Sequence, residues 1–277
     1  MTTLSQKNLL KLAQEDEEKG QISNAIQLLE EALSYGRSSE IVMSLCRLYR
    51  KNNQEDQAYT LIKEEPDLFS EPEIFEEYNK ILVANHYLIE ALQIENLLGK
   101  KMPIKVFPEK LDAQNNLMQK FKSKKEVSQF DYQSLLKLDL VNYKNFAQSL
   151  LLDPTQNFAV RLCLCEDFVR LGISDRIQVW ALGQVEEFIP KETELLEKTT
   201  VYREVIGGIG DRFRNNPSQL PLMLGETNIV LGSLYPKLNK YIKDTDSFTS
   251  DLISYLETKD GRTHQKLLDR VYANLPK

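Results

Sequence analysis

The chain has 277 residues and a formal net charge of −6, a length typical of one or two domains of roughly 100–200 residues each. Its 11 glycines and 10 prolines are too few for the closely spaced turns of an all-β sandwich or barrel. No apolar run approaches the roughly 18–20 residues that cross a bilayer, no secretory signal pattern is present, and Cys46, Cys163 and Cys165 are too few for a disulfide framework. We therefore expect a helix-rich cytoplasmic protein without a membrane partner.

The first hundred residues contain an internal repeat. Alanines recur at 25, 58 and 91, two steps of 33 residues, and large apolar residues follow the same spacing, as in Leu12, Leu45 and Tyr78. Gly20, Asn53 and His86 fall at equivalent points, where each unit is expected to turn. The pattern predicts three helical hairpins, in which the alanines allow the two helices to approach closely and the larger residues pack between neighbouring hairpins.

These units resemble tetratricopeptide repeats, which are helical hairpins of about 34 residues with small residues at fixed positions. The first unit, from Gln6, matches best, with Ala13, Ala25 and Ala32 at the small positions. The later units depart from the pattern, since Glu65 and Asn79 occupy small-residue positions. Lys124 would take the alanine position of a fourth unit, so we expect the array to end near residue 102.

The resemblance implies a concave surface, lined by the first helix of each hairpin, that binds a protein or peptide. The corresponding groove residues here are Leu10, Gln14, Glu17, Met43, Arg47, Arg50, Lys51, Glu76, Lys80 and Val83. One subset of the family holds a C-terminal carboxylate with groove cations. Those positions are here Leu10, Gln14, Ser44, Glu73 and Glu77, so we do not expect that use.

Arg47, Arg50 and Lys51 form a basic cluster at helical spacing within an acidic block. One hypothesis is that the cluster receives an acidic segment of a partner. The other, which we favour, is that it lies on a solvated helix face and pairs with nearby Glu40 or Glu55, an arrangement that adds only tenths of a kcal/mol per pair.

A basic segment follows the repeats. Residues 1–99 contain 9 basic and 18 acidic residues, whereas residues 100–125 contain eight lysines and only Glu109 and Asp112 as acids. We interpret the segment as a linker followed by a helix that begins near Asp112. It could dock on nucleic acid or another anionic surface, but packing against the protein's own acidic repeats is the better explanation, and nucleic acid is not the expected partner.

The second half is predicted to be mostly helical. A helix to about Leu152, a turn at Asp153 and Pro154, and a second helix to Leu171 capped by Gly172 are expected. The β-branched and aromatic residues of 177–189, divided at Gly183, predict a β-hairpin. Further helices are expected at about 193–214, 217–232 and 234–243, followed by a C-terminal pair divided at Gly261. The order of these features resembles an uncharacterised family of bacterial tetratricopeptide-type proteins, which implies no activity.

No motif indicates a catalytic or metal site. His86 and His264 have no partners at ligand spacing, and Cys163 and Cys165 are expected to be buried core thiols. The glycines of VIGGIGDRF (205–213) do not form a nucleotide-binding loop and predict a helix interruption or a site of close helix packing. KDTDSFTSDL (243–252) fails as a calcium loop and indicates a capped helix start.

We therefore expect a mostly all-α fold, with a tetratricopeptide-like α-hairpin solenoid of three degenerate units at 1–102, a basic linker and helix at 103–125, and a helical C-terminal domain at 126–277 with one β-hairpin near 177–189. The expected function is a non-catalytic scaffold or adaptor that binds a protein or peptide, with no cofactor and no metal. A peptide-sensing regulator and an enzyme with a site between the two halves are the alternatives.

Overall fold

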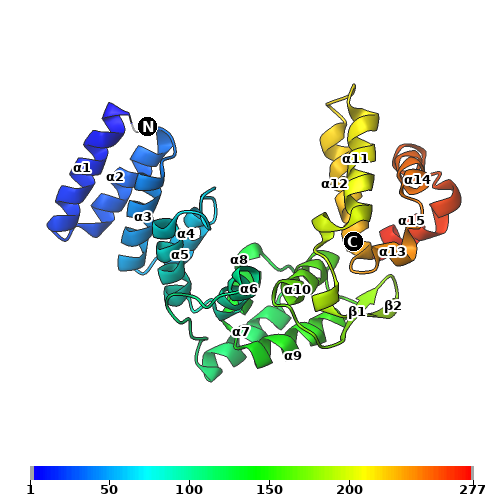
Figure 1. Ribbon diagram of the computed structural model, residues 1–277, viewed down its shortest axis with the longest axis horizontal. Coiled ribbons are helices and arrows are strands. Elements are labelled where there is room, and N and C mark those ends of the chain that lie inside the picture. Colours follow the sequence, from blue (N-terminus) through cyan, green and yellow to red (C-terminus); the bar gives the residue numbers. More distant parts are fainter. Residues whose placement is uncertain (1–2, 276–277) are drawn as a thin grey trace. The chain divides into compact units, whose positions relative to one another are not determined.

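The computed structural model describes residues 3–275, which form fifteen α-helices, four short 3-10 helices and one two-stranded sheet (Figure 1). The predicted fold class, mostly α with one β-hairpin, is confirmed. Within this range no helix is long and apolar enough to span a bilayer. The chain divides into two compact units. The first comprises the residues up to Ser123 together with Gln133–Leu140, and the second comprises Lys124–Tyr132 together with the residues from Val141 onward.

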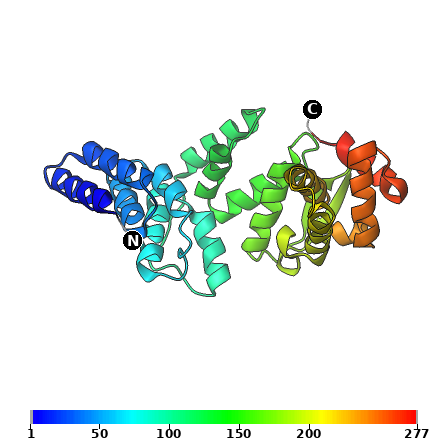
Figure 2. The same cartoon turned by 90° about the horizontal axis from the view of Figure 1, so that it is seen from above.

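The first unit begins with three consecutive helical hairpins (Figures 1 and 2). Their helices are α1 (Leu4–Glu18), α2 (Ile22–Ser34), α3 (Ser39–Lys51), α4 (Glu55–Ile62), α5 (Pro72–Asn85) and α6 (Leu88–Leu98). Each hairpin turns where the sequence predicts, because Gly20, Asn53 and His86 all adopt positive φ values, of 77°, 55° and 60°. This left-handed conformation ends a helix by satisfying its last carbonyl groups.

The aligned alanines are all buried. Ala25 and Ala58 are fully buried and Ala91 is 3% exposed. Leu45 and Tyr78 are also fully buried, whereas Leu12, at the equivalent position of the first hairpin, is 47% exposed because that hairpin has a neighbour on one side only. The positions that recur every 33 residues therefore belong to the buried core, except where the first hairpin lacks a neighbour.

The rest of the first unit closes the end of this array. The α6–α7 loop (residues 99–110) leads to α7 (Leu111–Ser123), which begins one residue before the predicted start at Asp112. The 3-10 helix η1 (Leu135–Lys137) packs against α6 and α7, and the Lys137 carbonyl accepts a hydrogen bond from the Glu109 backbone N–H at 2.9 Å. Of residues 103–125, expected to form a basic linker and helix, those up to Ser123 lie in the same compact unit as the hairpins.

The second unit combines the β-hairpin with a set of helices. Its first helices are α8 (Gln129–Ser134), which straddles the boundary, α9 (Leu140–Leu151) and α10 (Phe158–Arg170). The hairpin has strands β1 (Ile177–Ala181) and β2 (Gln184–Phe188), with Ile177 opposite Phe188. Its two-residue turn uses Leu182 and Gly183, both at positive φ, as a tight hairpin requires. Gly172, at φ 64°, ends α10 as predicted.

The C-terminal helices differ in length from the prediction. They are α11 (Thr200–Phe213), α12 (Leu220–Leu234), α13 (Leu238–Tyr241), α14 (Thr245–Thr258) and α15 (Gln265–Ala273). The helix expected from residue 193 begins only at Thr200, because residues 190–199 form two 3-10 turns and the Thr199 hydroxyl caps α11 by accepting from the Tyr202 N–H. The helix expected at 234–243 is reduced to a single turn. Asp244 caps α14, as the capped-start interpretation predicts.

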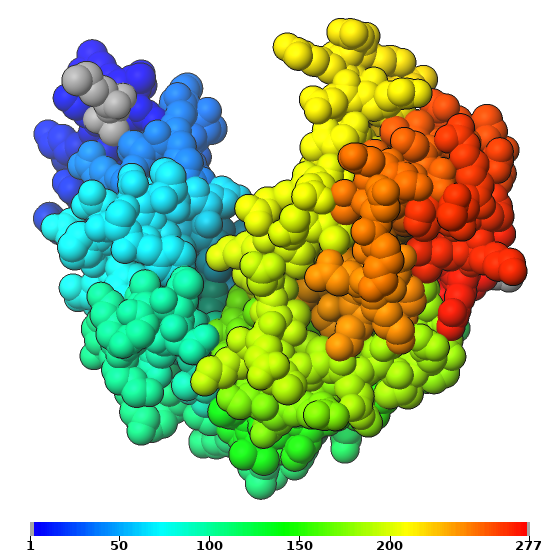
Figure 3. All heavy atoms as spheres, turned by 45° about the vertical axis from the view of Figure 1, so that its right-hand side comes forward, coloured from blue at the N-terminus to red at the C-terminus, as the bar shows by residue number. Residues whose placement is uncertain are grey.

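Helix α11 runs without interruption through its glycines, so the predicted break is wrong and the alternative of close packing is correct. A Cβ atom on Gly208 would lie 3.1 Å from Cγ2 of Thr249 on α14. Ile209 and Phe213 of α11 form a small core with Met223 of α12 and Ile253 of α14. The outer end of the α11–α12 pair projects beyond the orange and red helices of the same unit in Figure 3.

Candidate functional site

The predicted groove residues lie on α1, α3 and α5, the first helices of the three hairpins. Gln14, Arg47, Lys51 and Glu76 are exposed, and Glu17, Met43, Arg50, Lys80 and Val83 are partly buried. Leu10 is only 7% exposed and belongs to the core of the first hairpin. We call the surface formed by the other nine residues the α1/α3/α5 face.

Glu17 of α1 binds two basic residues of α3. The Arg47 guanidinium donates to both Glu17 carboxylate oxygens, at 2.7 and 2.6 Å, and Lys51 Nζ donates to Oε1 at 2.5 Å. Burial alone would raise the pKa of Glu17, but the hydrogen bonds from Lys51 and Arg47 lower it below the usual value. The side chains of Arg47 and Lys51 remain 44% and 50% exposed, so these pairs each stabilise the fold by no more than about 1 kcal/mol.

Arg50 of α3 makes the corresponding contact with α5. Its Nε and Nη2 atoms donate to the two carboxylate oxygens of Glu77, at 2.7 and 3.0 Å. The Glu77 side chain is only 8% exposed and that of Arg50 23%. In such a setting the loss of either partner leaves a buried charge without compensation.

The basic cluster therefore pairs with other hairpins and not with Glu40 or Glu55, the partners expected from the sequence. The reason is geometric: α1, α3 and α5 lie close enough for Glu17 and Glu77, far away in sequence, to reach the cluster from both sides. Each of the three cations is thus paired with an acid of the same unit, although Arg47 and Lys51 share the single carboxylate of Glu17. The α1/α3/α5 face is therefore a surface of ordered ion pairs. It also contains the Glu76–Lys80 pair, at 2.7 Å.

The two residues that break the small-residue pattern have polar roles. Glu65 is 5% exposed and accepts hydrogen bonds from Arg37 Nε at 2.8 Å and Ser39 Oγ at 2.9 Å. Asn79 is fully buried and pairs with the backbone of Ile104 in both directions, at 2.6 and 3.1 Å. The repeat pattern has small side chains at these two positions. Here the polar side chains of Glu65 and Asn79 instead bind neighbouring segments of the chain to the hairpins.

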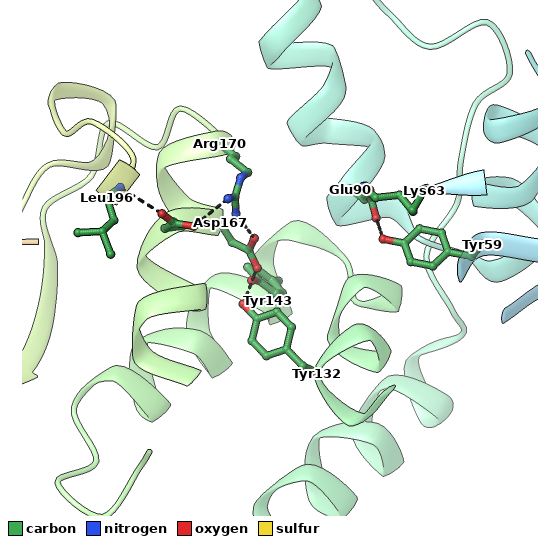
Figure 4. Close-up of polar contacts among 9 residues, drawn as sticks. Tyr59, Lys63, Glu90, Tyr132, Tyr143, Asp167, Arg170 and Leu196 are labelled. Atoms are coloured by element: carbon green, nitrogen blue, oxygen red, sulfur yellow. Dashed lines mark hydrogen bonds and ion pairs between the residues drawn. The ribbon is translucent and has the colours of Figure 1, made fainter. Parts of the chain in front are cut away.

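A buried carboxylate joins the second and third hairpins. Glu90 of α6, 6% exposed, accepts hydrogen bonds from the Tyr59 hydroxyl and from Lys63 Nζ (Figure 4). It also accepts one from the Tyr78 hydroxyl. Burial and the negative charge of Glu90 raise the pKa of Tyr78 well above its usual value, so this phenol stays protonated and donates. The cluster fixes the packing of α4, α5 and α6.

The second unit contains a similar cluster around Asp167 of α10. The hydroxyls of Tyr132 and Tyr143 each donate to Asp167 Oδ2 at 2.6 Å, and Figure 4 shows both rings directed at that carboxylate. Burial and the charge of Asp167 raise the pKa of both tyrosines well above the usual range. Arg170 lies 3.4 Å from Asp167 Oδ1 and donates to Glu166 Oε2 at 2.8 Å.

Sequence reasoning missed this cluster. Glu166 Oε1 also accepts a hydrogen bond from the Leu196 N–H at 3.1 Å. The adjacent acids Glu166 and Asp167 thus connect α10 to α8, to α9 and to the 3-10 turn before α11. One feature of the sequence could have indicated the cluster: two consecutive carboxylates lie within the otherwise apolar stretch LCLCEDFV of 162–169. Acids on such a stretch are expected to be buried, and buried acids require hydrogen-bond or charge partners.

The cysteines and histidines occupy ordinary structural positions. Cys46 and Cys165 are buried, but Cys163 is exposed, so its predicted burial is wrong; the two residues of α10 point to different sides of the helix. Partial burial and the carboxylates of Asp167 and Glu166 still raise the pKa of the Cys163 thiol to about 11. His264 Nδ1 lies 2.8 Å from Asp251 Oδ2. Residues 3–275 contain no group of three or more His, Cys, Asp or Glu side chains placed to hold a metal ion.

The second unit also has a cavity along the contact of α11 and α14. It has a volume of about 870 Å³ and polar walls, which include Arg212, Arg262, Asp211, Asp246, Glu257 and the hydroxyl residues Thr249, Ser250, Ser254 and Thr258. Charges of both signs surround it in similar number, so its walls do not favour a ligand of one charge. Gly208 of α11 also lines the cavity, next to Thr249 of α14.

Comparison of the chain with protein-family models, curated proteins and solved structures found no match.

Proposed function

We propose that the protein is a non-catalytic scaffold or adaptor that binds a segment of a partner protein on the α1/α3/α5 face, as tetratricopeptide-like solenoids do. The observation that carries the proposal is the set of cross-helix ion pairs, Glu17 with Arg47 and Lys51, and Arg50 with Glu77. They hold α1, α3 and α5 side by side and so present a preformed surface, which lowers the entropy cost of binding an extended or helical segment.

The charge pattern of this face indicates how the partner would be recognised. Because the cations are already paired with acids of the same unit, a partner gains little from net charge attraction. Contacts would instead come from exposed Gln14 and partly buried Met43 and Val83, through hydrogen bonds and apolar packing. We therefore expect affinity that changes little with salt concentration.

We further propose that the protein works in the cytoplasm. All three cysteines are free thiols, and Cys163 is exposed, an arrangement suited to a reducing compartment.

A peptide selection tests the binding proposal. Peptides selected from a random phage-displayed library on the immobilised full chain would be measured by fluorescence anisotropy against a double variant, Gln14→Arg with Val83→Arg. Added long cations at these two positions would obstruct the face, and we expect the Kd to rise at least about tenfold, or about 1.4 kcal/mol.

The matched control is Gln27→Arg with Gln57→Arg, which adds the same charge at exposed residues of α2 and α4. Its Kd should equal that of the wild type. Equal weakening by both double variants, or no effect of the Gln14 and Val83 changes, would show that the α1/α3/α5 face is not the binding surface.

A further inference from the structure

The α6–α7 loop folds back along α6 and encloses an apolar groove of about 390 Å³. The floor is formed by Leu88, Ala91 and Leu92 of α6 and by Met102 and Val106 of the loop, and Glu95, Lys101 and Lys105 lie at its edge. None of these residues belongs to the α1/α3/α5 face. We call this feature the α6 groove.

The loop wall of the α6 groove is held in place by side-chain to backbone hydrogen bonds. The Asn79 side chain binds both the N–H and the carbonyl of Ile104, and Glu95 Oε1 accepts from the Met102 N–H at 3.0 Å. Farther along, His86 Nδ1 lies 3.2 Å from the Phe107 carbonyl oxygen. Met102 and Val106 are consequently buried, at 8% and 3% exposure, so the groove is formed before any ligand arrives.

The charge around the groove is positive. Its one acid, Glu95, is bound by Lys101 Nζ at 2.7 Å, and although burial acts to raise its pKa, the hydrogen bonds from Lys101 and the Met102 amide lower it. Glu95 therefore remains ionised and already has a cation. Lys105 is exposed, and its Nζ lies 4.9 Å from the centre of the Phe107 ring, an aromatic contact that leaves its charge uncompensated.

Apolar side chains continue from the groove onto the surface. Ile104 is 39% exposed and Phe107 59%, and they alternate with Lys101 and Lys105 along the loop. A surface that combines an apolar groove with adjacent cations complements a segment that has apolar residues on one side and carboxylates beside them.

We propose that the α6 groove is a second docking site, which binds an acidic amphipathic segment of a partner protein. The apolar side chains of that segment insert between α6 and the α6–α7 loop, and its carboxylates pair with Lys105 and compete for Lys101. The basic composition of residues 100–125, eight lysines against two acids, then serves to attract the partner.

Two synthetic peptides test the proposal on the full chain. They share leucines at helical spacing and carry glutamate in one case and lysine in the other at the remaining positions. By fluorescence anisotropy at low salt, we expect the glutamate peptide to bind and the lysine peptide not to bind, and the affinity of the former to fall as salt is raised. Equal binding of both peptides would overturn the proposal.

Matched variants locate the site. Lys105→Glu at the groove edge and Leu92→Ser in the groove floor should each weaken binding of the glutamate peptide about tenfold, which is about 1.4 kcal/mol. Lys120→Glu is the control for charge, because Lys120 is an exposed residue of α7 outside the groove. Leu97→Ser is the control for the apolar change, because Leu97 of α6 is 67% exposed and also lies outside the groove. Both controls should bind as the wild type does.

Two results would overturn the assignment. Equal weakening by Lys105→Glu and Lys120→Glu would indicate charge attraction without a groove. Binding to vesicles of phosphatidylserine and phosphatidylcholine that depends on Leu92, with no binding of the glutamate peptide, would identify the surface as a lipid-binding one. Far-ultraviolet circular dichroism and the thermal midpoint of each variant establish that the fold is retained.

Discussion

Arg50 of α3 and Glu77 of α5 form a two-point ion pair, with hydrogen bonds of 2.7 and 3.0 Å, across the contact between the second and third hairpins. Arg47 makes an equally short two-point contact with Glu17, but it is 44% exposed where Arg50 is 23% exposed. Because the two ion pairs have similar geometry and differ in burial, a comparison of them measures how much burial adds to the contribution of an ion pair to stability.

Replacement of Arg50 by alanine should be much more destabilising than replacement of Arg47. Arg50→Ala leaves the buried Glu77 carboxylate without a partner, and we expect a loss of about 3 kcal/mol in the free energy of unfolding. Arg47→Ala should cost no more than about 1 kcal/mol, because Arg47 is 44% exposed and Lys51 still pairs with Glu17 after its loss. Urea denaturation of both variants gives the comparison, and equal losses would contradict it. Arg50→Met combined with Glu77→Leu, which removes both charges, should recover part of the loss.

The Asp167 cluster should depend on its phenol donors. Tyr143 is 1% exposed and donates to a buried carboxylate, so Tyr143→Phe should lower the free energy of unfolding by about 1.5–3 kcal/mol, the range for hydrogen bonds to charged groups. The control is Tyr202→Phe on α11, which removes an exposed hydrogen bond to Asn228 of 2.8 Å and should cost about 0.5 kcal/mol or less. Similar costs for the two variants would show that the cluster contributes nothing beyond an ordinary surface contact.

Stability should fall in acid partly through Glu186 of β2. Its carboxylate accepts hydrogen bonds from Lys240, Tyr241 and Gln184. Although burial acts to raise the pKa of Glu186, these donors lower it below the reference value of 4.5. A lowered folded-state pKa stabilises the protein above pH 4.5, and this stabilisation is lost as the pH falls through the folded-state value.

The acid effect can be measured with a single substitution. The difference in free energy of unfolding between the wild type and Glu186→Gln should be largest near pH 7 and shrink as the pH falls below about 4.5. Denaturant titrations across that range provide the values. A difference for Glu186→Gln that does not vary with pH would contradict the expectation.

Substitution by alanine should have different effects on stability at Gly207 and at Gly208 of α11. A Cβ atom on Gly207 would have no neighbour within 4 Å, so Gly207→Ala should stabilise the helix by about 0.5–1 kcal/mol. At Gly208 the new Cβ would lie 3.1 Å from Thr249 Cγ2, and displacement of α14 should cancel that gain. Thermal unfolding of the two variants measures the contrast, which would be refuted by an equal increase in midpoint for both.

The local features of the chain followed from its sequence. Gly20, Asn53 and His86 were placed at the hairpin turns by a 33-residue period, and the structure gives all three positive φ. The β-hairpin was indicated by β-branched residues around Gly183, and the observed register places Trp180 opposite Val185. Turn chemistry and apolar periodicity act over a few residues, which is why these features can be predicted from neighbouring positions.

The candidate sites depended on contacts between distant segments. Glu40 and Glu55 were the nearest acids in sequence to the basic cluster, yet Glu17 and Glu77 hold it, because the angle at which hairpins pack determines which side chains meet. The partners of Asp167 and the α6 groove likewise arise where α8, α9 or a folded-back loop meets another helix. The hairpins, their turns and the helical class could be predicted from the sequence, since they depend on local interactions. The pairing of the charges and the exposure of each surface could not, since electrostatic and packing energies depend on distances between segments that meet only in the folded protein.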